Sequence, residues 1–168
     1  MPSLIIHLAC AKEYIKKHPR DIKDEKRFFD GCVAPDFTEN KDKSHYKITD
    51  QFFAVDFKSF LNSTQVDMSD DYWRGYFFHL LCDDYFYRIF YRKESERALR
   101  NNDTFYRDYD LLNEKTIKKY QIHYFPEGVS ATTDIKGSLK YLQFKKVNKF
   151  IRKISKRSLK NYLKAINK

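Results

Sequence analysis

Residues 70–91 read DDYWRGYFFHLLCDDYFYRIFY, and this stretch decides the fold. Ten of the twenty residues that begin at Tyr72 are aromatic, so a helix formed here is apolar nearly all the way round rather than along one stripe. Ser69 is a suitable N-cap, and the two aspartates that follow it suit the positive end of the helix dipole. We therefore predict a buried, central helix near residues 70–92.

The rest of the chain also favours helices. Helical periodicity and capping signals predict further helices near 3–18, 21–30, 50–61, 111–121 and 136–166. Pro19 should end the first of these, and Gly31 is expected to be the C-cap of the second. Residues 32–46 are polar and irregular, and 93–110 are expected to form a charged linker. With only four glycines and four prolines, tight hairpins are few, so the sequence predicts an all-α, multi-helix bundle.

The excess of basic over acidic residues is confined to the last segment of the chain. Residues 145–168 hold ten of the 33 Lys and Arg residues and no acidic residue, which leaves 23 basic and 23 acidic residues elsewhere. We predict a helical metal-binding domain over 1–144 and a basic amphipathic helix over 145–168, packed on that domain or extending from it. A solvated helix face is one interpretation of the lysines, and contact with an anionic membrane or, less favoured, with nucleic acid is the other.

Several features favour a cytoplasmic protein. The chain has no apolar run of bilayer length, and its first residues lack the pattern of a secretory signal. The cysteines, Cys10, Cys32 and Cys82, are odd in number and set among apolar neighbours. We expect them to be reduced and buried.

The central helix carries the strongest candidate site. His79 and Asp83 are four residues apart, so they share one helix face and can bind one ion. A carboxylate in a buried helix needs a partner or a metal, and Gly75 allows a close approach one turn earlier. Upstream, GCVAPDFTENKDKSHY (31–46) supplies Asp36 and His45. Two nitrogen and two oxygen ligands of this kind suit zinc.

Other interpretations of the same residues remain open. A buried hydrogen bond between His79 and Asp83 needs no metal. The spacing His-x-x-Cys occurs twice, at His7 and at His79, and predicts a structural site of two Cys and two His. That site leaves the aspartates unexplained, so it ranks lower. A phosphohydrolase of the HD type needs adjacent His and Asp, but Leu80 follows His79.

The order of these fragments resembles a known family. A histidine in the first helix, then FFDGCVAPDF, SHY and a glycine followed by HLLCD, is similar to the zinc-dependent phospholipase C family over roughly residues 1–92. This chain looks like a short bacterial, leaderless member. The resemblance implies a fold of the phospholipase C / P1 nuclease type and hydrolysis of phosphodiester bonds at a zinc cluster. It also implies five zinc ligands: Asp36, His45, His79 and Asp83 for one ion, and His7 for another.

The chain departs from the family after Asp83. The family uses further histidines and a glutamate there, whereas this sequence has no histidine until His123. We therefore expect a reduced site with one Zn²⁺, or two if His7 takes part. Asp84, Glu39 and Asp30 are candidates to accept a proton from a metal-bound water, Asp84 being the nearest in sequence to the ligands. For each of these carboxylates the alternative is a solvated or helix-capping role. His123 is a candidate general acid or additional metal ligand.

Two functions follow from these observations. The first is a zinc-dependent phosphodiester hydrolase, phospholipase C-like, that acts on a phosphoester substrate such as a lipid headgroup. The second is a non-catalytic helical binding module that uses its basic C-terminal helix to dock on acidic partners, with any metal purely structural.

Overall fold

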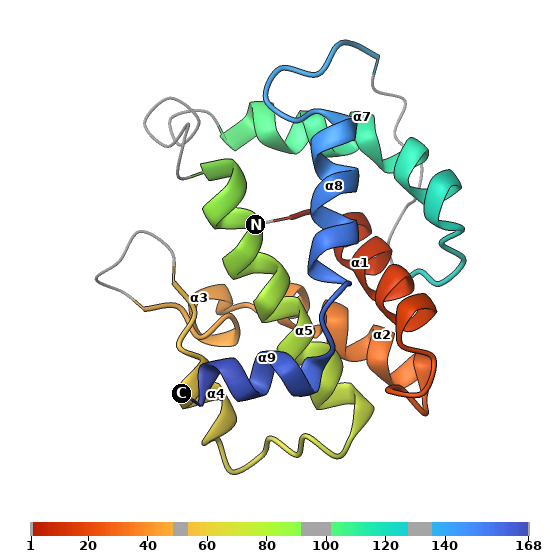
Figure 1. Cartoon of the computed structure of the whole chain (residues 1–168). Coiled ribbons are helices and arrows are strands. Elements are labelled where there is room, and N and C mark those ends of the chain that lie inside the picture. The colour runs from red at the N-terminus through yellow and green to blue at the C-terminus, as the bar shows by residue number, and fades with distance from the viewer. Residues whose placement is uncertain (1, 49–53, 92–101, 128–135, 168) are drawn as a thin grey trace.

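The computed structural model describes residues 2–48, 54–91, 102–127 and 136–167, and in these ranges the protein is mostly helical (Figure 1). The helices are α1 (Leu4–Lys17), α2 (Glu25–Val33), α3 (Lys41–Ser44), α4 (Phe57–Leu61), α5 (Asp71–Phe86), α7 (Asn102–Tyr120), α8 (Phe144–Ile154) and α9 (Leu159–Ile166). A short 3-10 helix, η1 (Ala34–Phe37), follows α2, and a π-helical turn, η2 (Tyr87–Tyr91), follows α5. The prediction of an all-α fold is confirmed at this level.

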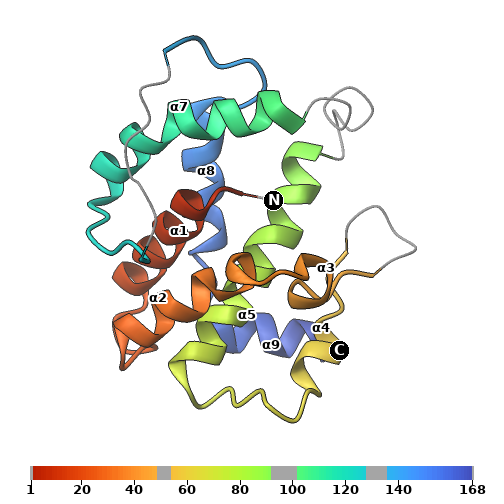
Figure 2. The same ribbon diagram turned by 180° about the vertical axis from the view of Figure 1, so that it is seen from behind.

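Helix α5 is the buried, central helix that the sequence predicted. It contacts α1, α2 and α8, which surround it in both views (Figures 1 and 2). Phe77, Phe78 and Leu80 are fully buried on different sides of it. Asp70 rather than Ser69 is its N-cap, because the Asp70 carboxylate accepts the backbone N–H of Tyr72.

Two glycines bring α2 and α5 into backbone contact. A Cβ on Gly31 would lie 1.9 Å from the carbonyl oxygen of Tyr72, and one on Gly75 would lie 2.1 Å from that of Phe28. The prediction that Gly31 caps α2 is therefore wrong, since the helix continues to Val33. Gly31 is needed where the two helices cross, and Gly75 provides the close approach expected of it.

The helix predicted over 136–166 is in fact two helices, α8 and α9, and it begins only at Phe144. Ser155 lies at the break, fully buried, and its hydroxyl donates to the carbonyl of Ile151 in α8, with the carbonyl of Cys10 in α1 at 3.3 Å. The backbone N–H of Leu159 then donates to the hydroxyl of Tyr14, also in α1. These buried polar contacts lie where the chain turns, and α8 and α9 run in different directions (Figure 1).

Two other boundaries also differ from the prediction. Residues 102–110, expected to be part of a linker, form the first half of α7, because Phe105, Tyr109 and Leu112 make a buried helical stripe among the charges. Of the helix expected over 50–61, only α4 is helical, and 49–53 lie outside the described residues.

All three cysteines are buried free thiols, as expected. Among the described helices, none is both long enough and apolar enough to cross a bilayer.

Candidate metal centre

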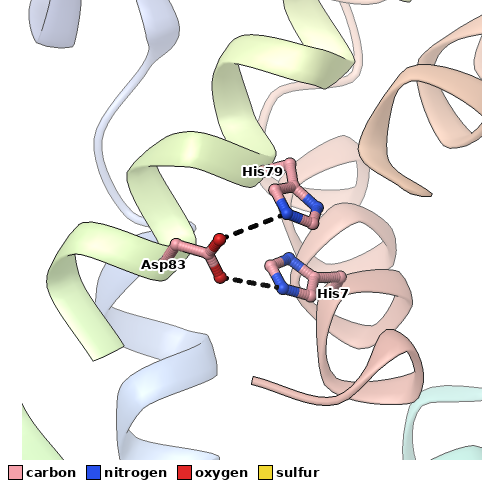
Figure 3. Close-up of side chains that lie close together, drawn as sticks. All are labelled: His7, His79 and Asp83. Atoms are coloured by element: carbon pink, nitrogen blue, oxygen red, sulfur yellow. Dashed lines mark ion pairs between the residues drawn. The ribbon is translucent and has the colours of Figure 1, made fainter. Parts of the chain in front are cut away.

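The centre of the site lies between α5 and α1. Figure 3 shows the carboxylate of Asp83 facing the rings of His79, one turn earlier on α5, and His7 on α1. Oδ2 of Asp83 lies 3.3 Å from Nε2 of His79, and Oδ1 lies 3.2 Å from Nε2 of His7. The two rings are stacked, with centroids 3.8 Å apart and planes 5° from parallel. All three side chains are at most 1% exposed.

The segment after α2 brings two more ligands to the same place. Asp36 lies in η1, which begins around Pro35, and His45 directly follows α3, so the region predicted as irregular is partly helical. Nε2 of His45 lies 3.4 Å from Oδ2 of Asp83 and 3.5 Å from Oδ1 of Asp36. Nε2 of His79 is only 3.1 Å from Nε2 of His45. The structure thus brings together all five predicted ligand residues.

Hydrogen bonds between side chains and backbone hold this segment in place. The hydroxyl of Ser44 donates to the carbonyl of Pro35 at 2.9 Å, which ties α3 to η1. The hydroxyl of Tyr76, on α5, donates to the carbonyl of Ser44 at 2.6 Å. Asn40 caps α3 by accepting the N–H of Lys43. The loop ligands are therefore positioned against the helix that carries the other two.

Backbone carbonyls set the orientation of two imidazoles. Nδ1 of His79 lies 2.7 Å from the carbonyl oxygen of Cys32, and Nδ1 of His45 lies 2.7 Å from that of Lys41. A carbonyl can only accept, so each Nδ1 carries the proton, and each neutral ring has a lone pair on Nε2. The two Nε2 lone pairs then meet at 3.1 Å beside carboxylate oxygens. Histidines that bind a metal commonly donate the N–H of their other ring nitrogen to a carbonyl or carboxylate in the same way.

Three of the candidate ligand atoms lie at separations that match those around one tetrahedral ion. Ligand atoms about 2.0–2.1 Å from a tetrahedral zinc lie about 3.3 Å from one another. Nε2 of His45, Nε2 of His79 and Oδ2 of Asp83 lie 3.1, 3.3 and 3.4 Å from one another. Asp36 adjoins this triangle through its Oδ1, 3.5 Å from Nε2 of His45. The donor set of two imidazoles and two carboxylates also suits zinc.

Several polar atoms here lack a hydrogen-bond partner within the described ranges. They are both ring nitrogens of His7 and both carboxylate oxygens of Asp83, whose close contacts lack the alignment of a hydrogen bond. Burial, and then the proximity of His79, lowers the pKa of His7, so this ring stays neutral. Unsatisfied buried acceptors are rare in folded proteins, and a bound cation would satisfy the carboxylate oxygens and the His7 nitrogen that carries a lone pair.

Other predicted residues lie apart from this group. Asp84 forms an ion pair with Arg88, one turn later, at 2.9 Å. Asp30 accepts hydrogen bonds from Lys26 and from Tyr124, on the other side of α2. Glu39 and His123 are exposed. A proton-accepting role for Asp84 stays a prediction.

The site of two Cys and two His is not formed. The groups of residues whose ligand atoms lie within 4.8 Å of one another are His7 with His79 and Asp83, and Asp36 with His45 and His79. Among the described residues, neither group includes Cys10 or Cys82. The thiols instead pack in the core, where burial raises the pKa of Cys82 well above its ordinary value.

Sequence reasoning missed the residues that position the ligands. The carbonyls of Cys32 and Lys41 leave no trace in the residue type. Tyr76 is one of many aromatic residues, so its hydroxyl gave no signal. Only Ser44 was marked, as the first residue of the SHY fragment.

One ligand can be reached from outside. The Asp36 side chain is 17% exposed, whereas those of His45, His79 and Asp83 are at most 1% exposed.

Comparison of the chain with protein-family models, with curated proteins and with solved structures found no significant match. The chemistry of the centre therefore rests on its own residues.

Proposed function

We propose that this protein is a zinc-dependent phosphodiester hydrolase with a reduced, phospholipase C-like metal centre, on a helical fold of the phospholipase C / P1 nuclease type. The observation that supports it most is the meeting of two Nε2 lone pairs and one carboxylate oxygen at separations of 3.1 to 3.4 Å, with a second carboxylate beside them, in a buried site. Asp36, His45, His79 and Asp83 would hold the ion.

A second ion position would share Asp83. The carboxylate directs Oδ2 toward His45 and His79 and Oδ1 toward His7, so its two oxygens face two different sets of nitrogens. A carboxylate placed in this way can bridge two ions, as in many enzymes that cleave phosphoesters. We propose one zinc as the minimum and a second, at His7, as the maximum.

The chain's own residues would shape the chemistry around the ion. A divalent ion in the site lowers the pKa of a bound water and polarises a phosphoryl oxygen. The burial of His45, His79 and Asp83 keeps bulk water from three sides, so that a phosphoester substrate would approach beside Asp36. Burial also raises the pKa of Asp84, which suits a proton acceptor, although Arg88 partly opposes this.

The near-complete burial favours a second function. A site with four protein ligands and little exposure is typical of structural zinc. In that case the protein is a non-catalytic helical module, and the ion holds η1 and α3 against α5.

Zinc content and hydrolysis together test both functions. Protein purified without added metal should contain at least one zinc per chain and hydrolyse bis(p-nitrophenyl) phosphate. Asp36→Asn and His79→Ala should lose both, whereas the exposed control His123→Ala should keep both. Metal-free wild-type protein of unchanged stability would contradict the metal centre. A full complement of zinc without any phosphodiester hydrolysis would instead support the structural role.

A further inference from the structure

Helices α8 and α9 together carry an unusual concentration of unpaired positive charge. Nine basic residues on or between them are exposed: Lys145, Lys146, Lys149, Arg152, Lys153, Lys156, Arg157, Lys160 and Lys164. Within the part of the chain that the structure describes, none of them forms an ion pair with a carboxylate, although pairs such as Lys26–Asp30 occur elsewhere. No acidic residue occurs in the sequence after Asp134. We call these nine residues the basic ridge.

The basic ridge lies on one side of the molecule. In Figure 1, α8 and α9 both lie toward the viewer, whereas in Figure 2, seen from behind, they recede behind α1 and α2. The apolar faces of both helices pack inward, with Phe150, Ile151 and Leu159 buried. The basic side chains of both helices are exposed, whereas their apolar side chains are buried.

Two apolar hollows interrupt the basic ridge. The first, about 400 Å³, is lined by Ile89, Phe90, Tyr141 and Phe150, and three ridge lysines surround it: Lys146, Lys149 and Lys153. Ile89 is 36% exposed. The second, about 510 Å³, is lined by Met68, Leu159 and Leu163 beside Arg74, Lys160 and Lys164. Cations around an apolar floor are complementary to a ligand that is itself an amphiphilic anion.

We propose that the basic ridge docks the protein on a bilayer that contains anionic phospholipid. The lysines contact headgroup phosphates and carboxylates, and the two hollows receive the apolar groups just beneath them. A nucleic-acid backbone would match the charge, but it offers no aliphatic group for a hollow lined by Ile89 or Leu163. The docking does not require the metal centre, so it holds for a hydrolase and for a binding module alike.

Vesicle sedimentation tests the proposal on the full chain. The wild-type protein should bind phosphatidylcholine vesicles that contain phosphatidylserine, and should bind pure phosphatidylcholine vesicles far less. A basic residue near an anionic surface contributes about fivefold in binding. The combined charge reversal of Lys146, Lys149 and Lys153 to Glu should therefore weaken binding by at least about a hundredfold.

A matched variant controls for net charge. Lys16, Lys115 and Lys118 are exposed on α1 and α7, the helices nearest the viewer in Figure 2. Their combined replacement by Glu changes the net charge equally and should alter binding less than the first variant does. If the first variant does not fold, Lys149→Glu alone should still weaken binding by at least about fivefold.

Further measurements decide between lipid and nucleic acid. Ile89→Gln should weaken vesicle binding and leave any binding to a DNA duplex unchanged. The proposal is overturned if the wild-type protein ignores anionic vesicles, if it binds the duplex more tightly than the vesicles, or if the ridge and control variants bind vesicles equally.

Discussion

Replacement of Gly75 by alanine should test whether the crossing of α2 and α5 controls the metal centre. The new Cβ would lie 2.1 Å from the carbonyl oxygen of Phe28, about 1.3 Å inside the 3.4 Å of an ordinary contact. The neighbour is backbone, so the helices themselves must separate. Overpacking of this kind costs about 1–3 kcal/mol. In helix propensity alone, replacing glycine by alanine would stabilise the helix by about 1 kcal/mol. A measured loss of stability would therefore come from the contact between α2 and α5.

The same separation should reach the proposed zinc ligands. The carbonyl of Cys32, in α2, accepts the Nδ1–H of His79 at 2.7 Å. If the helices part by about 1.3 Å at Gly75, one turn away, this bond lengthens beyond hydrogen-bonding range. Loss of an outer hydrogen bond to a ligating histidine lowers metal affinity about 10- to 100-fold. Gly75→Ala should therefore weaken zinc binding by a similar factor.

Zinc titration against a competing chelator, together with thermal unfolding, measures both effects. Gly31→Ala should behave alike, because its Cβ would lie 1.9 Å from the carbonyl of Tyr72 on the other side of the crossing. Asn161→Ala, exposed on α9, is the control and should change neither quantity. The reasoning is refuted if Gly75→Ala binds zinc with wild-type affinity, or if it is as stable as the control.

Two further predictions concern pH and the anchoring of α7. In zinc-free protein, burial lowers the pKa of His79, but the Asp83 carboxylate outweighs it and raises the pKa above 6.5. Protons therefore compete with zinc for His79 as the pH falls. The rise in melting temperature on adding zinc should be large at about pH 8 and small at about pH 5. Equal rises at the two pH values would contradict this prediction. Asp108 is 1% exposed and accepts the backbone N–H groups of residues 140–142. Asp108→Ala should lower the free energy of unfolding by about 1–3 kcal/mol in urea denaturation, because it leaves buried donors unpaired, and an unchanged midpoint would contradict this.

The sequence was sufficient for the part of the site that depends on local periodicity. The pair His79 and Asp83 could be assigned to one helix face because helical geometry alone sets the i, i+4 relation. The burial of that helix followed from its aromatic composition. Asp36 and His45 could be named as candidates only from the order of the sequence fragments. No local rule predicts that a loop about 40 residues upstream packs against the helix face of His79 and Asp83.

What the sequence could not supply depends on backbone groups and on tertiary contacts. The carbonyls of Cys32 and Lys41 orient two ligands, yet any residue type provides a carbonyl. Gly31 has the same sequence signature as a C-cap, and only the position of α5 shows that it serves the helix crossing. The start of α9 is likewise tied to α1 by the N–H of Leu159 donating to the hydroxyl of Tyr14, a contact that amphipathic periodicity does not predict.

Charge balance distinguishes a metal from the metal-free alternative. Burial would raise the pKa of Asp83, but the imidazoles of His79 and His7 outweigh it and hold the pKa well below its ordinary value, so this carboxylate is ionised.

The pKa of Asp36 is also lowered, because His45 and the other imidazoles outweigh its burial. Without metal, a proton on His79 would leave two carboxylates facing a single positive charge, because His7 stays neutral. A divalent ion in the site would neutralise both carboxylates and could use both Nε2 lone pairs at once. A buried cluster that is left with net charge is costly, so this donor set is better matched to a divalent cation than to a proton.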